Sequence, residues 1–213
     1  MSDTELVDIL TPPTFDQSGV VMSKDEAYTQ GYWIATFNLW MVRTQPEPAL
    51  LMQMRSKQSQ LEPNSLDVTV GGHYQSGETM LDGLREADEE LGKSYAKQNL
   101  TFLGRKIYVG IDTKQRLRKN IVYVFIGVDN DPLTSFALQP EELDGLYICK
   151  IKDIISLFDG SIKTAAAEGI DSFKKEHILT YSLKSFPYNY DNYILKMASL
   201  ATRYINGDRQ LLI

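Results

Sequence analysis

Hydrophobic and polar positions follow a strand-like pattern through the first third of the chain. The stretch from Gly31, YWIATFNLWMV, is rich in aromatic and β-branched residues and predicts a strand. After a proline-containing break, ALLMQMRS predicts its hairpin partner. Residues 67–70 alternate in the same way and run directly into Gly71 and Gly72, where the backbone can turn or approach a ligand closely. These patterns predict an antiparallel pair and a third, shorter strand.

The later segments mix predicted strands with predicted helices. The strands are expected at residues 100–111, 121–129 and 145–151, and the helices at 79–91, 153–158 and 172–181. A last helix, with Gly207 as its stop, is predicted by the apolar spacing of Tyr193, Ile194, Met197, Leu200, Ala201 and Tyr204. Its apolar face is expected to pack on the core or on a second copy of the chain. The mixture indicates an α+β fold.

The length of 213 residues suits one well-cored domain better than two small ones. We expect residues 1–30 to form an N-terminal arm or hairpin, because they are polar and rich in turn signals. Residues 31–159 then form the core, and residues 160–213 form a C-terminal helical extension packed on the same domain. The apolar surface of this extension predicts a homodimer.

Composition and charge narrow the classes of function. Hydrophobic residues make up 43% and charged residues 23% of the chain, which is typical of soluble globular proteins. The net charge of −6 argues against binding a nucleic acid polymer or an anionic membrane. We interpret the basic run from Lys114 to Lys119 as a solvated hairpin turn, in preference to a phosphate-binding patch. Cys149 is the sole cysteine, so a reducing, cytoplasmic location is expected.

The predicted helix at residues 79–91 sorts its side chains onto two faces. At about 100° per residue, leucines gather on one face, and the opposite face carries Glu86, Glu89 and Glu90. Like charges at this spacing repel by a few tenths of a kcal/mol per pair. Such a face is either solvated or holds a hard divalent cation such as Mg²⁺, which prefers oxygen ligands.

The residues around this helix resemble a known signature. The matching positions are Gly72, Glu78, Arg85, Glu86, Glu89, Glu90 and Gly92, which resemble the Nudix box G-x5-E-x7-R-E-U-x-E-E-x-G-U, where U is bulky and apolar. The resemblance implies a Nudix fold, a mixed β-sheet sandwiched between helices, and hydrolysis of diphosphates linked to another moiety. It also implies that the three glutamates of READEELG bind Mg²⁺ or Mn²⁺ and that Arg85 and Glu78 orient them. Only six residues separate Glu78 from Arg85, against seven in the pattern, so the reach of Glu78 depends on where the helix begins.

A wider stretch, residues 27–155, is similar to the Nudix branch that contains isopentenyl-diphosphate isomerases and their hydrolase relatives. The resemblance rests on GYWIATFNLWMV, LLMQMRS and LDVTVGGHYQSGE in that order. Those isomerases use a cysteine near the box and several histidines. This chain has no cysteine there, and His73 and His177 are its only histidines. Isomerase chemistry is therefore disfavoured.

Other residues near the box are candidates for substrate binding. Gln53 and Arg55 point to one face of their strand, where Arg55 either clamps a diphosphate or forms a surface ion pair. His73 either contacts a phosphate or is bonded to its own loop. Glu142, with Glu141 as alternate, resembles a family loop that supplies another carboxylate to metal or water.

These observations predict metal-assisted hydrolysis of the diphosphate bond of a nucleoside diphosphate derivative or another organic diphosphate. Glu89, Glu90, Arg85 and Glu142 are the expected catalytic groups, and Gly72, His73, Gln53 and Arg55 are expected at the substrate. Two alternatives stay open: a non-catalytic Nudix-like protein that binds a phosphorylated ligand, and an isomerase of the branch named above.

Overall fold

The computed structural model describes residues 5–187 and 191–213. The strands are β1 (Leu6–Thr11), β2 (Asp16–Ser23), β3 (Trp33–Arg43), β4 (Ala49–Arg55), β5 (Leu66–Asp67), β6 (Val70–His73), β7 (Thr101–Ile111), β8 (Leu117–Val128), β9 (Leu143–Lys150), β10 (Ala165–Ile170) and β11 (Glu176–Tyr181). The helices are α1 (Lys24–Thr29), α2 (Arg85–Leu91), α3 (Ile151–Phe158) and α4 (Tyr193–Ile205). Strands and helices are mixed along the chain, as the sequence predicts.

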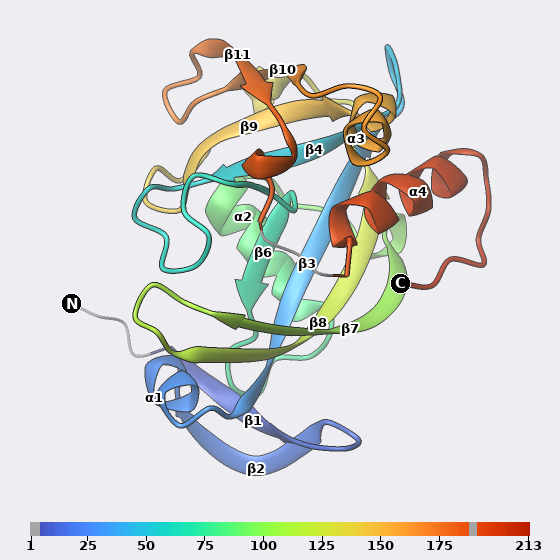
Figure 1. Cartoon of the computed structure of the whole chain (residues 1–213). Helices are drawn as coiled ribbons and strands as arrows, with labels where there is room; N and C mark the ends of the chain where they lie inside the picture. The colour runs from blue at the N-terminus through green and yellow to red at the C-terminus, as the bar shows by residue number, and fades with distance from the viewer. Residues whose placement is uncertain (1–4, 188–190) are drawn as a thin grey trace.

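Strand β3 organises the sheet because it pairs with four other strands. Along one edge it runs parallel to β8 over its whole length. Along the other edge it pairs antiparallel with β1 near its start, with β6 in its middle and with β4 at its end. The sheet is therefore mixed, and the loop after β6, which carries the box, starts from its centre (Figure 1).

The two faces of the sheet are buried by different helices. Successive side chains of a strand point to opposite faces, so Trp40 and Val42 of β3 pack with α3 and α4, whereas Leu39 and Met41 pack with α2. Figure 1 shows α3 and α4 in front of β3 and α2 behind it. The prediction of an α+β fold with a mixed sheet between helices is confirmed.

Residues 5–30 contain the hairpin β1–β2 followed by α1, and they belong to the same fold as the rest of the described chain. Val7 and Ile9 of β1 pack with Ala27 and Tyr28 of α1 and with Ile34 of β3. The expected N-terminal hairpin is present, and α1 brings its side chains against the start of β3 and β8. Helix α1 thereby reaches the edge of the site described below.

The helix predicted at residues 172–181 is wrong. This segment forms a turn and β11, which pairs antiparallel with β10. The turn is held by Asp171, whose Oδ1 accepts hydrogen bonds from the backbone N–H groups of Phe173 and Lys175 at 2.9 and 3.0 Å. Exposed and covered positions then alternate along β11, which is the strand period of two.

Helix α4 is present at the predicted residues, but its apolar face is not available to a second copy of the chain. Met197, Ala198 and Ala201 are fully buried against the core shared with α3. The exposed large apolar side chains among the described residues of this segment are instead Phe173, Ile178, Leu183 and Leu212, which are 87%, 76%, 47% and 80% exposed. Helix α4 therefore does not support a homodimer, and exposed apolar side chains lie on the β10–β11 hairpin instead.

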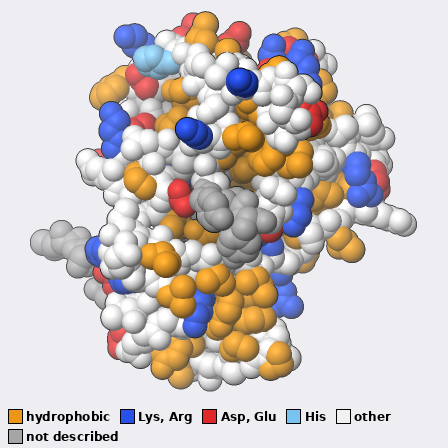
Figure 2. Space-filling model, in the orientation of Figure 1, with side chains coloured by type: hydrophobic (Ala, Val, Ile, Leu, Met, Phe, Trp, Pro, Cys, Tyr) orange, Lys and Arg blue, Asp and Glu red, His pale blue; other side chains and the backbone are white. Residues whose placement is uncertain are grey.

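No helix in the described residues is long and apolar enough to cross a membrane. On the face shown in Figure 2, Lys and Arg side chains are scattered among polar and hydrophobic ones and do not form one continuous basic field. A polyanion-binding surface needs such clustering. This face therefore offers nothing that favours a nucleic acid polymer.

Candidate active site

The signature stretch folds as a loop, a short helix and a second loop. The helix is shorter than the predicted residues 79–91, because Asp82 accepts hydrogen bonds from Thr79 N and Thr79 Oγ1 at 2.8 and 2.6 Å and holds a turn there. A 3-10 turn, Asp82–Leu84, leads into α2, which ends at Gly92 with a left-handed φ of 60°. Only a residue without Cβ adopts this conformation readily.

The leucine face of the helix packs as predicted, and the acidic face is divided. Leu84 and Leu91 are buried in the core beside β3. Glu89 is half-exposed, whereas Glu90 is buried, with 6% of its surface exposed. The carboxylates of α2 therefore occupy different environments, and a simple solvated face does not describe them.

Arg85 connects the carboxylates of the signature. Its Nε lies 3.0 Å from Glu78 Oε1, its Nη2 lies 3.0 Å from Glu86 Oε1 and its Nη1 lies 2.6 Å from Glu89 Oε2. Nη2 also donates to the His73 carbonyl at 3.3 Å. These contacts fix the orientation of the carboxylates, and their negative charges raise the pKa of Arg85.

Glu86 and Glu90 are the two carboxyl groups of α2 whose pKa values are strongly raised. Burial raises the pKa of Glu86 to about 7, although neighbouring Arg85 opposes the shift. Burial also raises the pKa of Glu90 well above its usual range, and the charges of Glu86 and Glu142 add to the effect. Two neighbouring carboxyl groups that both resist ionisation indicate a binding site for a cation.

Glycine is required opposite Glu86. A Cβ atom on Gly72 would overlap the Glu86 carboxyl group, so the bare backbone of β6 makes room for this side chain. The backbone of Gly71 lies close to the Glu90 carboxyl group and opposes the rise in its pKa. The two glycines thus form the wall of the sheet against which the carboxylates rest.

The donor set fits a hard divalent cation. Glu90 Oε2 is buried and has no hydrogen-bond partner among the described residues, which leaves an oxygen lone pair to be satisfied. Mg²⁺ is commonly held by one or two carboxylates, with waters and substrate phosphates as its other ligands. Within residues 5–187 and 191–213 no three His, Cys, Asp or Glu side chains already converge as a ligand set. Glu86 and Glu90 therefore fit best, and Glu89, which is held by Arg85, stays a predicted ligand.

The loop before β9 is fastened to the end of α2. The carbonyls of Glu90 and Leu91 accept hydrogen bonds from the backbone N–H groups of Gln139 and Ala137 at 2.9 and 2.8 Å. The exposed Glu142 follows in the same loop, and its charge acts on Glu90. Glu141 and Glu142 both line the neighbouring pocket, so the structure brings the predicted extra carboxylate to the site.

The two candidates on β4 have different positions. Gln53 is buried, with 1% of its surface exposed, and it does not line the pocket, so its expected place at a substrate is wrong. Arg55 lines the pocket, but its guanidinium is held by the chain: it donates to Leu61 O at 2.9 Å and to Ser59 Oγ at 2.7 Å, and it pairs with Asp67 at 3.3 Å. These contacts use the Arg55 guanidinium to stabilise the β4–β5 loop.

The imidazole of His73 is hydrogen-bonded to another element of the chain and not to its own loop. Its Nε2 lies 2.8 Å from the Tyr28 hydroxyl, which belongs to α1. Burial, together with the charges of Lys24 and Arg118, holds the pKa of His73 well below its usual range. His73 lines the pocket in the neutral form.

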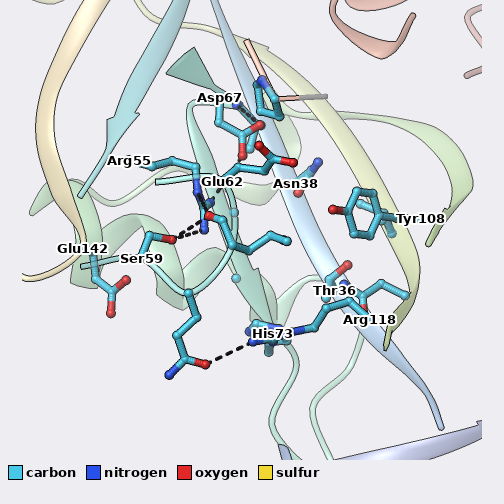
Figure 3. A pocket seen from close by; sticks show the side chains of 18 of the residues that line it. Thr36, Asn38, Arg55, Ser59, Glu62, Asp67, His73, Tyr108, Arg118 and Glu142 are labelled. Atoms are coloured by element: carbon cyan, nitrogen blue, oxygen red, sulfur yellow. Dashed lines mark hydrogen bonds and ion pairs between the residues drawn. The ribbon is translucent and has the colours of Figure 1, made fainter. Parts of the chain in front are cut away.

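The pocket has a volume of about 410 Å³ and opens beside β6 (Figure 3). Its walls come from α1, the β4–β5 loop, β6, the β7–β8 hairpin and the start of α4. Most of the lining side chains are polar or charged. The lining residues that the sequence did not point to include Lys24, Tyr28, Lys106, Arg118 and Asn120.

The interpretation of the run from Lys114 to Lys119 as solvated is wrong for Arg118. The buried carboxylate of Asp112 holds Arg118 Nε at 2.9 Å, and the side chain is only 7% exposed. The signal available in the sequence was the strand period of two, which places Arg118 and Asn120 on one face of β8.

Comparison with known proteins agrees with this geometry. The family model described as NUDIX domain matches residues 34–169. An uncharacterized Nudix hydrolase of Clostridium acetobutylicum is 30% identical over 151 residues, which cover 69% of this chain and 71% of the relative. A second one, from Nostoc, is 32% identical over 151 residues, which cover 67% and 85%. The crystal structure of a Deinococcus radiodurans protein has the same fold, with a TM-score of 0.54 and 22% identity over 73% of this chain and 90% of the other.

Proposed function

This chain belongs to the Nudix hydrolase family, and we propose that it cleaves the diphosphate bond of a nucleoside diphosphate derivative or another organic diphosphate with the help of Mg²⁺ or Mn²⁺. The observation that carries the proposal is the pair Glu86 and Glu90. Glu90 is buried and Glu86 largely so, both have raised pKa values, and they lie beside a polar pocket large enough for an organic diphosphate.

Glu86 and Glu90 would hold the cation, with Glu89 as a further ligand. When bound, the cation neutralises the diphosphate, polarises a phosphorus and makes a water more acidic. Arg85 keeps Glu86 and Glu89 in place through its two ion pairs, and Glu78 keeps Arg85 in place. Gly72 lets Glu86 lie flat against β6.

A carboxylate removes the proton from the attacking water. Glu142 is our first candidate because it lines the pocket and its charge reaches Glu90. Glu89 and Glu90 are the alternatives within the box. A placed base of this kind contributes on the order of 10² to 10⁴ in rate.

The composition of the pocket supports a polar organic group on the diphosphate. Amide, hydroxyl and imidazole side chains, among them Asn38, Thr36 and His73, line it together with Arg55 and Glu62. Burying such groups against a hydrocarbon chain leaves them without hydrogen-bond partners, which costs free energy. A prenyl diphosphate therefore fits less well than a sugar or nucleoside derivative.

The test is a phosphate-release screen over organic diphosphates with Mg²⁺ and with Mn²⁺. We expect turnover by the wild-type chain and its loss in Glu90→Gln and Glu86→Gln, with Asp88→Asn as the matched control. Asp88 is an exposed acid on the same helix, bonded to Ser94 outside the signature face. Full activity in both glutamine variants would refute the assignment.

The same screen separates the two alternatives. A non-catalytic phospholigand-binding protein is stabilised by a diphosphate without turnover. An isomerase of the isopentenyl-diphosphate branch interconverts prenyl diphosphates without releasing phosphate. Membership of that branch is a further proposal, supported by the order of the LLMQMRS and GGH segments.

We also propose that the protein is a cytoplasmic homodimer. The sole cysteine, which is buried, supports a reducing compartment. Exposed Ile178 on β11, which is the edge strand of the sheet that the described residues form, supports self-association. Light scattering of wild type and Ile178→Lys tests the dimer, and an unchanged mass in both rules out this surface.

A further inference from the structure

The end of the pocket that faces α1 is rich in hydrogen-bond donors. We call it the α1 end, and its members are Lys24, Tyr28, His73, Arg118 and Asn120. Lys24 and Tyr28 come from α1, outside the residues that match the family model. Arg118 and Asn120 come from β8, on the face opposite to Lys119. Figure 3 shows Arg118 and His73 together on one side of the pocket, away from Arg55 and Asp67.

Arg118 is held rigidly. Asp112 Oδ2 lies 2.9 Å from both its Nε and its Nη2, and Nη2 also donates to Gln60 Oε1 at 3.2 Å. Its guanidinium carbon lies 3.8 Å from the centre of the Tyr28 ring, which is a stacking distance. None of the contacts with Asp112 and Gln60 uses Nη1. The structure thus presents a fixed cation at the pocket, with little side-chain entropy left to lose on binding.

The hydrogen bonds around Tyr28 fix the direction of the neighbouring donors. Tyr28 has one hydroxyl proton and donates it to Asn120 Oδ1 at 3.0 Å. It must therefore accept the 2.8 Å hydrogen bond from His73, which carries its proton on Nε2. Because Tyr28 uses the carbonyl oxygen of Asn120, the hydrogen bonds among the described residues leave the two N–H donors of the Asn120 amide for another partner.

Positive charge dominates the surroundings of His73. Lys24, Arg118, Arg55 and Arg85 all act to keep its imidazole neutral. Several acids offset part of this field: Glu5 pairs with Lys24, Asp67 with Arg55 and Asp112 with Arg118. Asp25, which also lines the pocket, pairs with Arg116 at 2.8 Å. The Asp112 pair uses Nε and Nη2 of Arg118.

We propose that Arg118, Lys24 and the Asn120 amide form an anion subsite at the α1 end of the pocket, and that its ligand is a phosphoryl group. A tetrahedral oxyanion accepts several charge-assisted hydrogen bonds at once, which matches a guanidinium, an ammonium and an amide around one space. The role of the subsite in holding a substrate phosphate rests on the proposed function. Its affinity for phosphate does not.

The experiment measures binding of inorganic pyrophosphate to the full chain by calorimetry in EDTA. Without a cation the box glutamates repel pyrophosphate, so binding reports the basic subsite. We expect Arg118→Gln to weaken binding about ten-fold or more, because a hydrogen bond to a charged group is lost. Asn120→Asp keeps the shape but adds a negative charge, and we expect a similar loss. Lys119→Gln is the matched control, since it removes a charge from the same strand on the opposite face, and its affinity should stay near that of wild type.

The outcomes are distinct. No binding by wild type, or an equal loss in Lys119→Gln and Arg118→Gln, overturns the subsite. Thermal unfolding checks that Arg118→Gln folds; if it does not, Asn120→Asp and Lys24→Gln decide by the same criterion.

In turnover assays the variants should raise KM more than they lower kcat. Selective loss of pyrophosphate binding in a chain that hydrolyses no diphosphate would leave the subsite standing and refute the proposed function. Turnover with unchanged KM and unchanged pyrophosphate affinity in all variants would refute the subsite and leave the proposed function standing.

Discussion

Arg85 Nε and Glu78 Oε1 lie 3.0 Å apart, although the sequence places these residues one position closer than the Nudix pattern does. The loop takes up the difference. Asp82 holds a turn at Thr79, a 3-10 turn follows, and α2 begins only at Arg85. Because the missing residue is removed from the loop and not from the helix, the spacing of Glu86, Glu89 and Glu90 is unaffected.

The Arg85 contacts predict that the shape of its side chain matters as well as its charge. Arg85→Lys should lower kcat by about ten-fold or more, because an ammonium cannot reproduce the planar fork that joins three carboxylates. The free energy of unfolding should change by about 1 kcal/mol or less, since Glu89 is half-exposed and such ion pairs contribute little. Steady-state kinetics and urea unfolding measure the two effects. Wild-type kcat in Arg85→Lys would contradict the organising role.

The elements that follow one period over many residues could be predicted from the sequence. The strands β3, β4 and β7 and the helix α4 lie where the patterns put them, whereas β8 begins at Leu117, before the predicted residues 121–129. The failure at residues 172–181 has a local cause. Six of its residues, Ser172, Lys174, Lys175, Glu176, His177 and Thr180, are charged or polar and suit either structure. Pairing with β10, which no local pattern encodes, decided for a strand.

The candidate site was predictable where residues close in sequence meet, and less so elsewhere. The box residues from Gly72 to Gly92 come together within one loop and one helix. Arg118, by contrast, reaches the pocket because β8 runs parallel to β3 and because Asp112 and Tyr28 turn its side chain inward. Gln53 failed as a candidate because β4 lies between β5 and β9 in the sheet and the side chain is buried, with 1% of its surface exposed. These are long-range contacts without a local signal.

Gly72 and Gly83 predict two different effects of the same substitution. A Cβ atom on Gly72 meets the Glu86 carboxyl group, which is the end of a flexible side chain, so Gly72→Ala should displace Glu86 and lower activity by about ten-fold or more while stability changes little. A Cβ atom on Gly83 comes within 2.6 Å of the Phe37 ring in the core, so Gly83→Ala should cost about 1–3 kcal/mol of stability. Activity per folded molecule and thermal unfolding measure the contrast. Equal effects on stability would contradict it.

His73 predicts a loss of stability in mild acid. Its folded pKa is well below 6.5, so between these two values the unfolded chain binds more protons than the folded one. The contribution of neutral His73 is fully present above pH 6.5 and is lost as the pH falls toward the folded pKa, by at most about 1.4 kcal/mol per pH unit. Urea unfolding of wild type and His73→Gln at pH 7.5 and pH 5 measures it. We expect the wild type to lose more stability than the variant, and parallel losses would show that His73 is not the cause.

Glu86 predicts that binding of Mg²⁺ strengthens as the pH rises. Its pKa is about 7 in the folded, metal-free protein and 4.5 in the unfolded chain, so the folded state binds more protons in this window. The stability of the metal-free protein therefore falls as the pH rises from 4.5 to 7. A cation must displace the same proton, so it binds better at pH 8 than at pH 6.

At a hundred times its Kd, Mg²⁺ adds about 2.7 kcal/mol to the stability. Thermal unfolding with and without Mg²⁺ should show the larger increase in Tm at pH 8 for wild type and for Asp88→Asn, and little increase for Glu86→Gln. An equal increase at both pH values, or one that survives in Glu86→Gln, would place the cation elsewhere.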